Sequence, residues 1–230
     1  MANMRLVLDG AALVANWHVL DRLSGNASAG AAVKADGYGL GAVDVVKRLA
    51  RAGCTDFFVA HWHEAKALAG LVDPSRLAVL HGLAPGEESV AASGLAVPVL
   101  NSAEQIARWR QAGGGRCHVM IDTGMGRLGL DWRDDIAGLC AELDVDLCLS
   151  HLASADENSP QNAMQRLRFE QVRHQVAASR YSLANSAGIA LGHDYHFDCT
   201  RPGLALYGGV PCAALAAHIK PVMRLEARIL

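Results

Sequence analysis

The sequence predicts an α/β protein built as a closed (β/α)8 barrel, and three observations support this prediction. Eight short apolar runs rich in Val and Leu recur along the 230 residues. Amphipathic helical patterns separate most of these runs, which is typical of right-handed βαβ units and a parallel sheet buried on both faces. Polar side chains gather where the runs end, at the rim where such barrels build their sites. An open doubly wound sheet is the alternative, because a count of units does not establish closure.

The predicted elements follow one another in a regular order. An extended segment at residues 5–8 precedes a first helix at residues 10–23, on which Leu13, Trp17 and Leu20 share one face. The eight strands are predicted at residues 30–34, 56–60, 77–80, 97–100, 118–121, 146–151, 181–185 and 199–201. Further helices are predicted at residues 40–52, 103–111, 134–143 and 162–178.

The two ends of the chain do not belong to the eight units. Residues 223–230 begin to alternate as a strand does, and residues 5–8 form a similar orphan strand. Two such strands would pair in a second, β-rich domain. We therefore predict a barrel over residues 1–220 and, at residues 221–230, the start of a truncated, mostly missing C-terminal β domain. An ordinary frayed terminus is the alternative.

Composition limits the class of protein. The chain is 51% hydrophobic and 19% charged, with a net charge of −2, so it has enough apolar residues for a full core and no basic stripe for nucleic acid. The apolar stretch at residues 204–219 is too short to span a membrane, and the N-terminus lacks the shape of a signal peptide. The six cysteines form no C-x-x-C pair. We expect reduced core cysteines, a cytoplasmic location and no metal site.

Residues 31–41, AAVKADGYGLG, place a lysine at the end of an apolar run. Desolvation lowers the pKa of such an amine, which makes Lys34 a candidate nucleophile or Schiff-base former. The alternative is a lysine just past the strand end that extends into solvent. Gly37, Gly39 and Gly41 favour the first interpretation, because glycines allow the backbone and its N–H groups to approach an anionic ligand.

Four further polar residues lie at or near the carboxyl ends of later predicted strands. They are Arg127, His151, Ser186 and Arg201. In a barrel these strand ends form one rim. Unrelated polar residues have no structural reason to gather there, so we expect them to share a ligand with Lys34.

Five motifs in order give the chain a resemblance to a known family over nearly its whole length. They are VKADGYG at residues 33–39, IDTGMGRLG at 121–129, HLASAD at 151–156, NSA at 185–187 and RPGLALYG at 201–208. The chain resembles the N-terminal TIM-barrel domain of the alanine racemases, fold type III enzymes that use pyridoxal 5′-phosphate.

The resemblance implies a role for each motif. Lys34 would hold the cofactor as an aldimine and serve as the base on one face of the substrate Cα. Arg127 would reach the substrate carboxylate or the phenolic oxygen of the cofactor. His151 would lie against the pyridine ring. The implied phosphate-binding residues are Tyr38, Ser186, Gly203 and Leu204, with Asn185 lining the same cup.

Arg201 would face the pyridine nitrogen. An arginine cannot accept a proton there, so the ring is a weaker electron sink and racemisation is favoured over transamination. The implied function is an isomerase that interconverts L- and D-alanine. Such an enzyme serves D-alanine biosynthesis and the supply of a peptidoglycan precursor, and its full-length form is a homodimer.

The chain departs from the family's pattern in two places. The family's second base is a tyrosine in the C-terminal domain of the neighbouring subunit, and no tyrosine here sits in a matching motif. We therefore expect this chain alone to bind the cofactor and to be weakly active or inactive. Met120 stands where many relatives carry a carbamylated lysine that braces the arginine matching Arg127. A non-catalytic pyridoxal-phosphate barrel, or a racemase of serine or broader specificity, remains the alternative.

Overall fold

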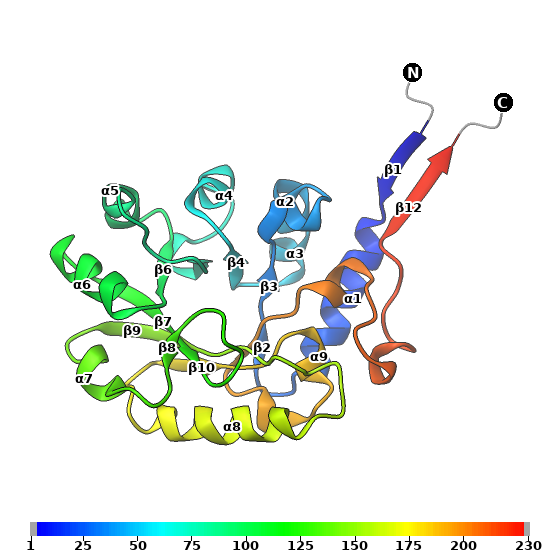
Figure 1. Ribbon diagram of the computed structural model, residues 1–230. Coiled ribbons are helices and arrows are strands. Elements are labelled where there is room, and N and C mark those ends of the chain that lie inside the picture. Colours follow the sequence, from blue (N-terminus) through cyan, green and yellow to red (C-terminus); the bar gives the residue numbers. More distant parts are fainter. Residues whose placement is uncertain (1–3, 228–230) are drawn as a thin grey trace.

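A curled parallel sheet forms the centre of the protein, and the computed structural model describes it within residues 4–227. Seven strands pair in the order β3-β4-β5-β6-β7-β9-β10, each parallel to the next. Figure 1 shows helices arranged around the outside of these strands. The bounds are β3 (Ala31–Ala32), β4 (Phe57–Val59), β5 (Leu77–Val79), β6 (Val97–Leu100), β7 (Arg116–Asp122), β9 (Asp144–Leu149) and β10 (Arg180–Ser182).

The ring of strands closes through two short strands at its ends. β2 (Ser28–Ala29) pairs in parallel with β11 (Cys199–Thr200), and β2 continues into β3 after one residue. On the other side of β11, the Asp198 N–H donates to the Tyr181 carbonyl at 3.0 Å and the Arg201 N–H donates to the Ala184 carbonyl at 2.8 Å. The predicted barrel is therefore confirmed, and the open doubly wound sheet is wrong.

The helices lie near the predicted positions. α1 (Gly10–Leu23) and α6 (Ala103–Gln111) have the predicted bounds, and α3 (Ala42–Ala52) begins two residues late. The Asp135 side chain caps α7 (Ile136–Cys140), which begins two residues later and ends three residues earlier than predicted. The Ser159 side chain caps α8 (Pro160–Arg173), which begins two residues earlier and ends five residues earlier than predicted. The short helices α2 (Lys34–Tyr38), α4 (Trp62–Ala67), α5 (Glu88–Ala92) and α9 (Ser186–Ile189), and the two-residue strand β8 (Leu130–Asp131), complete these elements.

Six of the eight predicted strands end one to three residues earlier than expected. β9 stops at Leu149, so His151 lies in the connection that follows it. β3 stops at Ala32, so Lys34 lies beyond the strand and begins α2. β10 stops at Ser182 and β11 at Thr200, which places Ser186 and Arg201 in the connections that follow. Single backbone bonds continue past these strand ends, from the Val33 N–H to the Phe58 carbonyl and from the Arg201 N–H to the Ala184 carbonyl, but they do not extend the regular ladder.

Two apolar layers form the core. The larger one lies between the sheet and the surrounding helices and includes Leu13, Val46, Ile106 and Phe169. The smaller one fills the inside of the barrel with side chains from successive strands, as is usual for this architecture. Its members are Phe58, Ala78, Val99, Met120, Leu147, Leu149 and Cys199.

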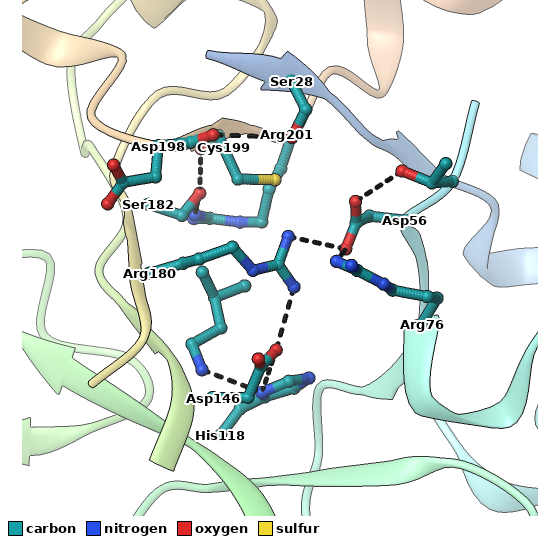
Figure 2. A network of polar contacts seen from close by, with 12 residues as sticks. Ser28, Asp56, Arg76, His118, Asp146, Arg180, Ser182, Asp198, Cys199 and Arg201 are labelled. Atoms are coloured by element: carbon teal, nitrogen blue, oxygen red, sulfur yellow. Dashed lines mark hydrogen bonds and ion pairs between the residues drawn. The ribbon is translucent and has the colours of Figure 1, made fainter. Parts of the chain in front are cut away.

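An ionic layer closes the barrel below the apolar layer, near the amino ends of the strands. Arg180 donates to Asp56 at 2.9 Å and to Asp146 at 2.8 Å, and both carboxylates are buried. Figure 2 shows the Arg180 guanidinium lying between them. Burial lowers the pKa of His118 to about 4, so its imidazole is neutral at pH 7 and accepts the Leu147 N–H at 3.2 Å.

The two orphan strands pair with each other. β1 (Met4–Leu8) and β12 (Met223–Ala227) form an antiparallel ribbon in which Leu6 lies opposite Leu225. In Figure 1 the ribbon projects from the body of the barrel beyond α1. Residues 228–230 of the predicted terminal strand lie outside the described residues.

The part of the chain that the structure describes contains neither a membrane-spanning helix nor a group of metal ligands. Within residues 4–227, every helix is too short or too polar to cross the hydrocarbon core of a membrane. In the same part of the chain no three His, Cys, Asp or Glu side chains are grouped as metal ligands. All six cysteines are free thiols, five of them buried.

Candidate active site

A cavity of about 590 Å³ opens at the carboxyl ends of the strands. Its wall includes every residue that the sequence marks as a site residue. These nine are Lys34, Tyr38, Arg127, His151, Asn185, Ser186, Arg201, Gly203 and Leu204. The structure therefore brings together residues from five motifs that are up to 170 positions apart, while their individual roles stay predictions.

Lys34 enters the cavity from an unusual turn. The Val33 N–H still donates to the Phe58 carbonyl at 2.8 Å, so strand-like pairing lasts until the residue before the lysine. Ala35, Asp36, Gly37 and Tyr38 then all have left-handed backbone angles, with φ between 52° and 64°. Each non-glycine residue in this conformation costs roughly 1–2 kcal/mol. Other contacts must therefore hold the turn.

Glu64 supplies one of these contacts, and it is not among the site residues predicted from the sequence. Its carboxylate accepts the Ala60 and His61 N–H groups at the start of α4, at 2.7 and 3.0 Å, and reaches across to the Ala35 N–H. These backbone donors hold the pKa of Glu64 below its usual value, despite partial burial that opposes the shift. An acidic residue three positions into a helix is the sequence signal of a capping box. That signal does not predict the contact between Glu64 and the Ala35 N–H.

Electrostatics favour a neutral amine on Lys34. Burial lowers the pKa of Lys34 below its ordinary 10.5, the nearby Arg127 and Arg201 lower it further, and Glu64 opposes them. A lowered pKa increases the fraction of the nucleophilic, unprotonated amine near neutral pH. Lys34 is therefore suited to covalent chemistry with a carbonyl group.

Ser186 and Gly203 form a cup in the wall of the cavity, next to the strand that leads to Lys34. The Ser186 Oγ accepts the Gly203 and Ala205 N–H groups at 2.9 and 3.1 Å, which leaves the hydroxyl proton available to a ligand. The Gly203 N–H is thus bonded within the cup, and its role toward a phosphate stays a prediction. The neighbouring Leu204 N–H finds no acceptor within residues 4–227.

Tyr38 covers one side of this cup. Its ring stacks on that of Tyr207 with a centroid distance of 4.6 Å, and the Tyr207 hydroxyl is anchored on the Ala32 carbonyl at 2.9 Å. A Cβ at Gly203 would lie only 2.2 Å from the Tyr38 hydroxyl oxygen, so that oxygen touches the cup. Burial raises the pKa of Tyr38, and its hydroxyl therefore stays a donor at neutral pH.

Asn185 and His151 lie on either side of the cup. The Asn185 Oδ1 accepts the Gly188 N–H at 2.9 Å and caps α9, which fixes the direction of its amide. Burial lowers the pKa of His151 to about 3, and the charges of Arg201, Arg127 and Lys34 lower it as well. The His151 ring is therefore neutral at pH 7 and can pack against an aromatic ligand.

Arg201 is buried, and within residues 4–227 it pairs with no carboxylate. Its guanidinium donates to two neutral oxygens, the Ser182 hydroxyl and the Ser150 carbonyl. Burial lowers the pKa of Arg201 to about 10, so the side chain keeps its charge at pH 7. Figure 2 shows Arg201 beside Ser182, on the far side of Arg180 from Asp146. A charge without a counterion invites an electron-rich ligand atom.

Arg127 is carried by a loop that one carboxylate organises. Asp122 accepts the N–H groups of Gly124, Met125 and Gly126, each at 2.8 Å. Arg127 itself is exposed and makes no hydrogen bond or ion pair with the residues that the structure describes. Met120 packs in the apolar layer inside the barrel and also lines the cavity.

Other lining residues were not found from the sequence. They are mainly apolar side chains and two polar ones: Ala32, Phe58, Ala60, Leu80, His81, Met120, Met125, Leu128, Asp156, Ala187 and Pro211. Three basic side chains, from Lys34, Arg127 and Arg201, face one acidic lining residue, Asp156. The cavity is therefore suited to a ligand with an apolar ring and negative charge.

The family model of the alanine racemase N-terminal domain matches residues 8–211. This range holds every lining residue of the cavity. The chain belongs to the alanine racemase family. The resemblance stated from the motifs is thus confirmed.

Relatives within the alanine racemase family are similar over nearly the whole chain. The alanine racemase of Rhizobium meliloti is 42% identical over 99% of this chain and 63% of its own length. That of Acidiphilium cryptum is 42% identical over the whole chain and 67% of its own length. The chain thus spans a little under two thirds of the length of the first of these relatives.

Solved alanine racemases share the fold. The Bartonella henselae enzyme, whose structure contains covalently bound pyridoxal phosphate, has a TM-score of 0.90 and 34% identity, and covers this whole chain with 67% of its own. The biosynthetic enzyme of Pseudomonas aeruginosa has a TM-score of 0.87 and 31% identity over 98% of this chain and 66% of its own.

Proposed function

We propose that this chain is the cofactor-binding barrel of a pyridoxal-phosphate-dependent racemase that interconverts L- and D-alanine. One observation carries the proposal: a single cavity joins a lysine of lowered pKa, an uncompensated buried arginine and a cup of free donors. Membership of the alanine racemase family and the cofactor of the Bartonella henselae neighbour support it.

The residues present fit pyridoxal phosphate. The Ser186 hydroxyl proton, the Leu204 N–H and the Tyr38 hydroxyl are donors suited to a phosphate dianion. Gly203 leaves space where a side chain would strike Tyr38. The neutral His151 ring provides an aromatic surface, and the charged Arg201 guanidinium would supply a donor for a ring nitrogen.

Pyridoxal phosphate, when bound, supplies an electron-withdrawing ring that acidifies the Cα–H of an amino acid attached to it. The Lys34 Nζ would bond to the cofactor's carbonyl carbon and, once displaced by substrate, take or return the proton on one face of Cα. Arg127 would hold the substrate carboxylate in its planar fork of donors. Arg201, which keeps its proton, would limit the electron withdrawal of the ring and thereby favour return of the proton to Cα.

Two-base racemisation needs a second proton carrier on the other face of the substrate Cα. Among residues 4–227, Tyr38 is the only tyrosine lining the cavity, and it covers the phosphate cup. We propose that the second base is a tyrosine of a C-terminal β domain, contributed by the other subunit of a homodimer. Residues 221–230 would begin that domain after the barrel of residues 1–220. Residues 1–230 alone would then bind the cofactor and racemise alanine weakly or not at all.

A spectral titration with pyridoxal phosphate, followed by borohydride reduction and peptide mapping, tests the proposal. We expect one cofactor per chain, attached at Lys34, and little D-alanine formation by this chain. A chain extended by the C-terminal domain of a relative should gain racemase activity. Absence of specific labelling at Lys34 in both chains would refute the proposal.

Replacing Gly203 with alanine tests the phosphate cup. The new Cβ must displace the Tyr38 hydroxyl, which is the free end of a partly exposed side chain, so the fold should tolerate the change. We expect the dissociation constant for pyridoxal phosphate to rise about tenfold through the loss of one phosphate donor. Titration should show this with an unchanged thermal midpoint. An unchanged dissociation constant for pyridoxal phosphate would show that Tyr38 and Gly203 do not contribute to phosphate binding.

One observation favours a second candidate function, a non-catalytic pyridoxal-phosphate barrel. The described residues contain the elements for holding the cofactor but no evident second base. An exposed Arg127 facing the cavity argues for a substrate carboxylate and hence for the racemase. The extended chain described above discriminates between the two, because a carrier would stay inactive with the added domain.

A further inference from the structure

Resting on the proposed function, we propose that Gln165 is a positioning residue that ties the loop bearing Arg127 to the loop bearing His151. Gln165 lies in α8, on the outside of the barrel, and its side chain is fully buried. It does not line the cavity. Its action on the site is therefore indirect, through the backbone of the two loops.

The carboxamide of Gln165 contacts both loops at once. Its Nε2 donates to the His151 carbonyl at 2.9 Å and to the Thr123 Oγ1 at 3.2 Å. Its Oε1 accepts the Ala153 N–H at 2.9 Å. Both amide protons and the oxygen are thus used, which defines the orientation of the amide. In the part of the chain that the structure describes, Gln165 is the residue of α8 that hydrogen-bonds to His151.

Arg201 is reached through the same group. The Thr123 hydroxyl lies 2.8 Å from the Ser150 hydroxyl, and the Ser150 carbonyl accepts from the Arg201 guanidinium. A short chain of buried contacts therefore links Gln165 to one end of Arg201. The Gln165 amide is thus hydrogen-bonded to the loops that carry Arg127 and His151 and, through Thr123 and Ser150, is linked to the Arg201 guanidinium.

Neighbouring residues of α8 reinforce the loops farther out. Gln161 donates to the Gly124 carbonyl at 2.9 Å, and Arg168 donates to the Thr123 carbonyl at 2.8 Å. Gln161, Gln165 and Arg168 follow helical spacing and so share one face of α8. Because these outer contacts remain when Gln165 is changed, the loops should stay folded while losing their fixed separation near His151.

Two substitutions remove different parts of the contact. Gln165→Met keeps the length of the side chain and loses all three hydrogen bonds. Gln165→Glu keeps the acceptor for the Ala153 N–H and, when ionised, loses both donors. Asn16→Asp is a matched control, because Asn16 is also a fully buried helical amide, with bonds to the Leu206 and Lys220 carbonyls and the Lys220 N–H.

The readouts are amide hydrogen exchange and the dissociation constant for pyridoxal phosphate, measured well below the thermal midpoints. For Gln165→Met we expect about tenfold faster exchange in peptides covering residues 122–127 and 150–155, and an approximately tenfold weaker cofactor affinity. For Gln165→Glu we expect the same loosening at residues 122–127 but retained protection at Ala153. Asn16→Asp should lower the thermal midpoint without either local change.

The outcomes separate positioning from general destabilisation. In one outcome, amide exchange at the two loops and cofactor affinity change in all three variants in proportion to the fall in thermal midpoint. Gln165 is then only a stabilising residue, and the proposal is wrong. Unchanged loop exchange in Gln165→Met refutes it as well. If the unmodified chain captures no cofactor at Lys34, the proposed function fails, whereas a local loosening at the two loops would still establish the tie itself.

Discussion

Replacing Lys34 with alanine should abolish covalent capture of pyridoxal phosphate by this chain. Lys34 is the cavity's only primary amine among the described residues, so borohydride has no other nearby bond to reduce. The fold should remain intact, because the amine lies beyond the end of β3 and its removal relieves repulsion from Arg127 and Arg201. Mass spectrometry of the reduced protein and its thermal midpoint provide the two measurements.

Lys47→Ala is the control for this variant, since Lys47 is an exposed residue of α3. It should retain full labelling at Lys34. In the unmodified chain, labelling of Lys34 should persist to lower pH than labelling of exposed lysines, because its lowered pKa keeps part of the amine unprotonated there. Equal labelling stoichiometry in the Lys34→Ala chain would show that the cofactor is attached elsewhere.

Replacing Arg180 with methionine should lower the free energy of unfolding by about 3 kcal/mol, because it leaves two buried carboxylates without their shared partner. Of their arginine partners, Asp56 would keep Arg76 and Asp146 would keep Arg116, which reach them from the surface. Urea unfolding at pH 7, followed by circular dichroism, measures the change.

Arg133→Met is the matched control, because Arg133 forms an ion pair with Asp131 that lies in solvent. Its unfolding midpoint should equal that of the unmodified chain within error, since exposed ion pairs are screened and contribute little. A loss in Arg180→Met no larger than in this control would show that the ionic layer does not stabilise the barrel.

Much of the fold could be predicted from local patterns. The apolar spacing on residues 10–23 and 103–111 marks α1 and α6 correctly, because both helices bury one side against the sheet. Strand lengths were less predictable. Apolar residues such as Leu183 and Ala184 are fully buried whether or not they pair in a ladder, so burial alone extends a predicted strand too far.

The motifs predict where the site lies, but they do not predict the contacts that hold its residues in place. The residues that resemble family motifs all reach the cavity, whereas Glu64 and Gln165 read as ordinary polar positions of helices. Their contacts join residues 29 and 42 positions apart, and periodicity carries no information about such pairs. The left-handed angles of Ala35 and Asp36 were equally hidden, because alanine does not favour them and aspartate adopts them as an isolated residue, not in a run.

The turn after β3 also sets an order of events during folding. Its Ala35 N–H has its acceptor on Glu64, which belongs to the next βα unit along the chain. This contact forms only after the segment between residues 35 and 64 has closed into a loop. Before then, the free-energy cost of the left-handed backbone angles is too high for the turn to persist. We therefore expect the barrel strands β3 and β4 to pair before Lys34 reaches its place. A newly made chain would then have its scaffold before its reactive amine is in position.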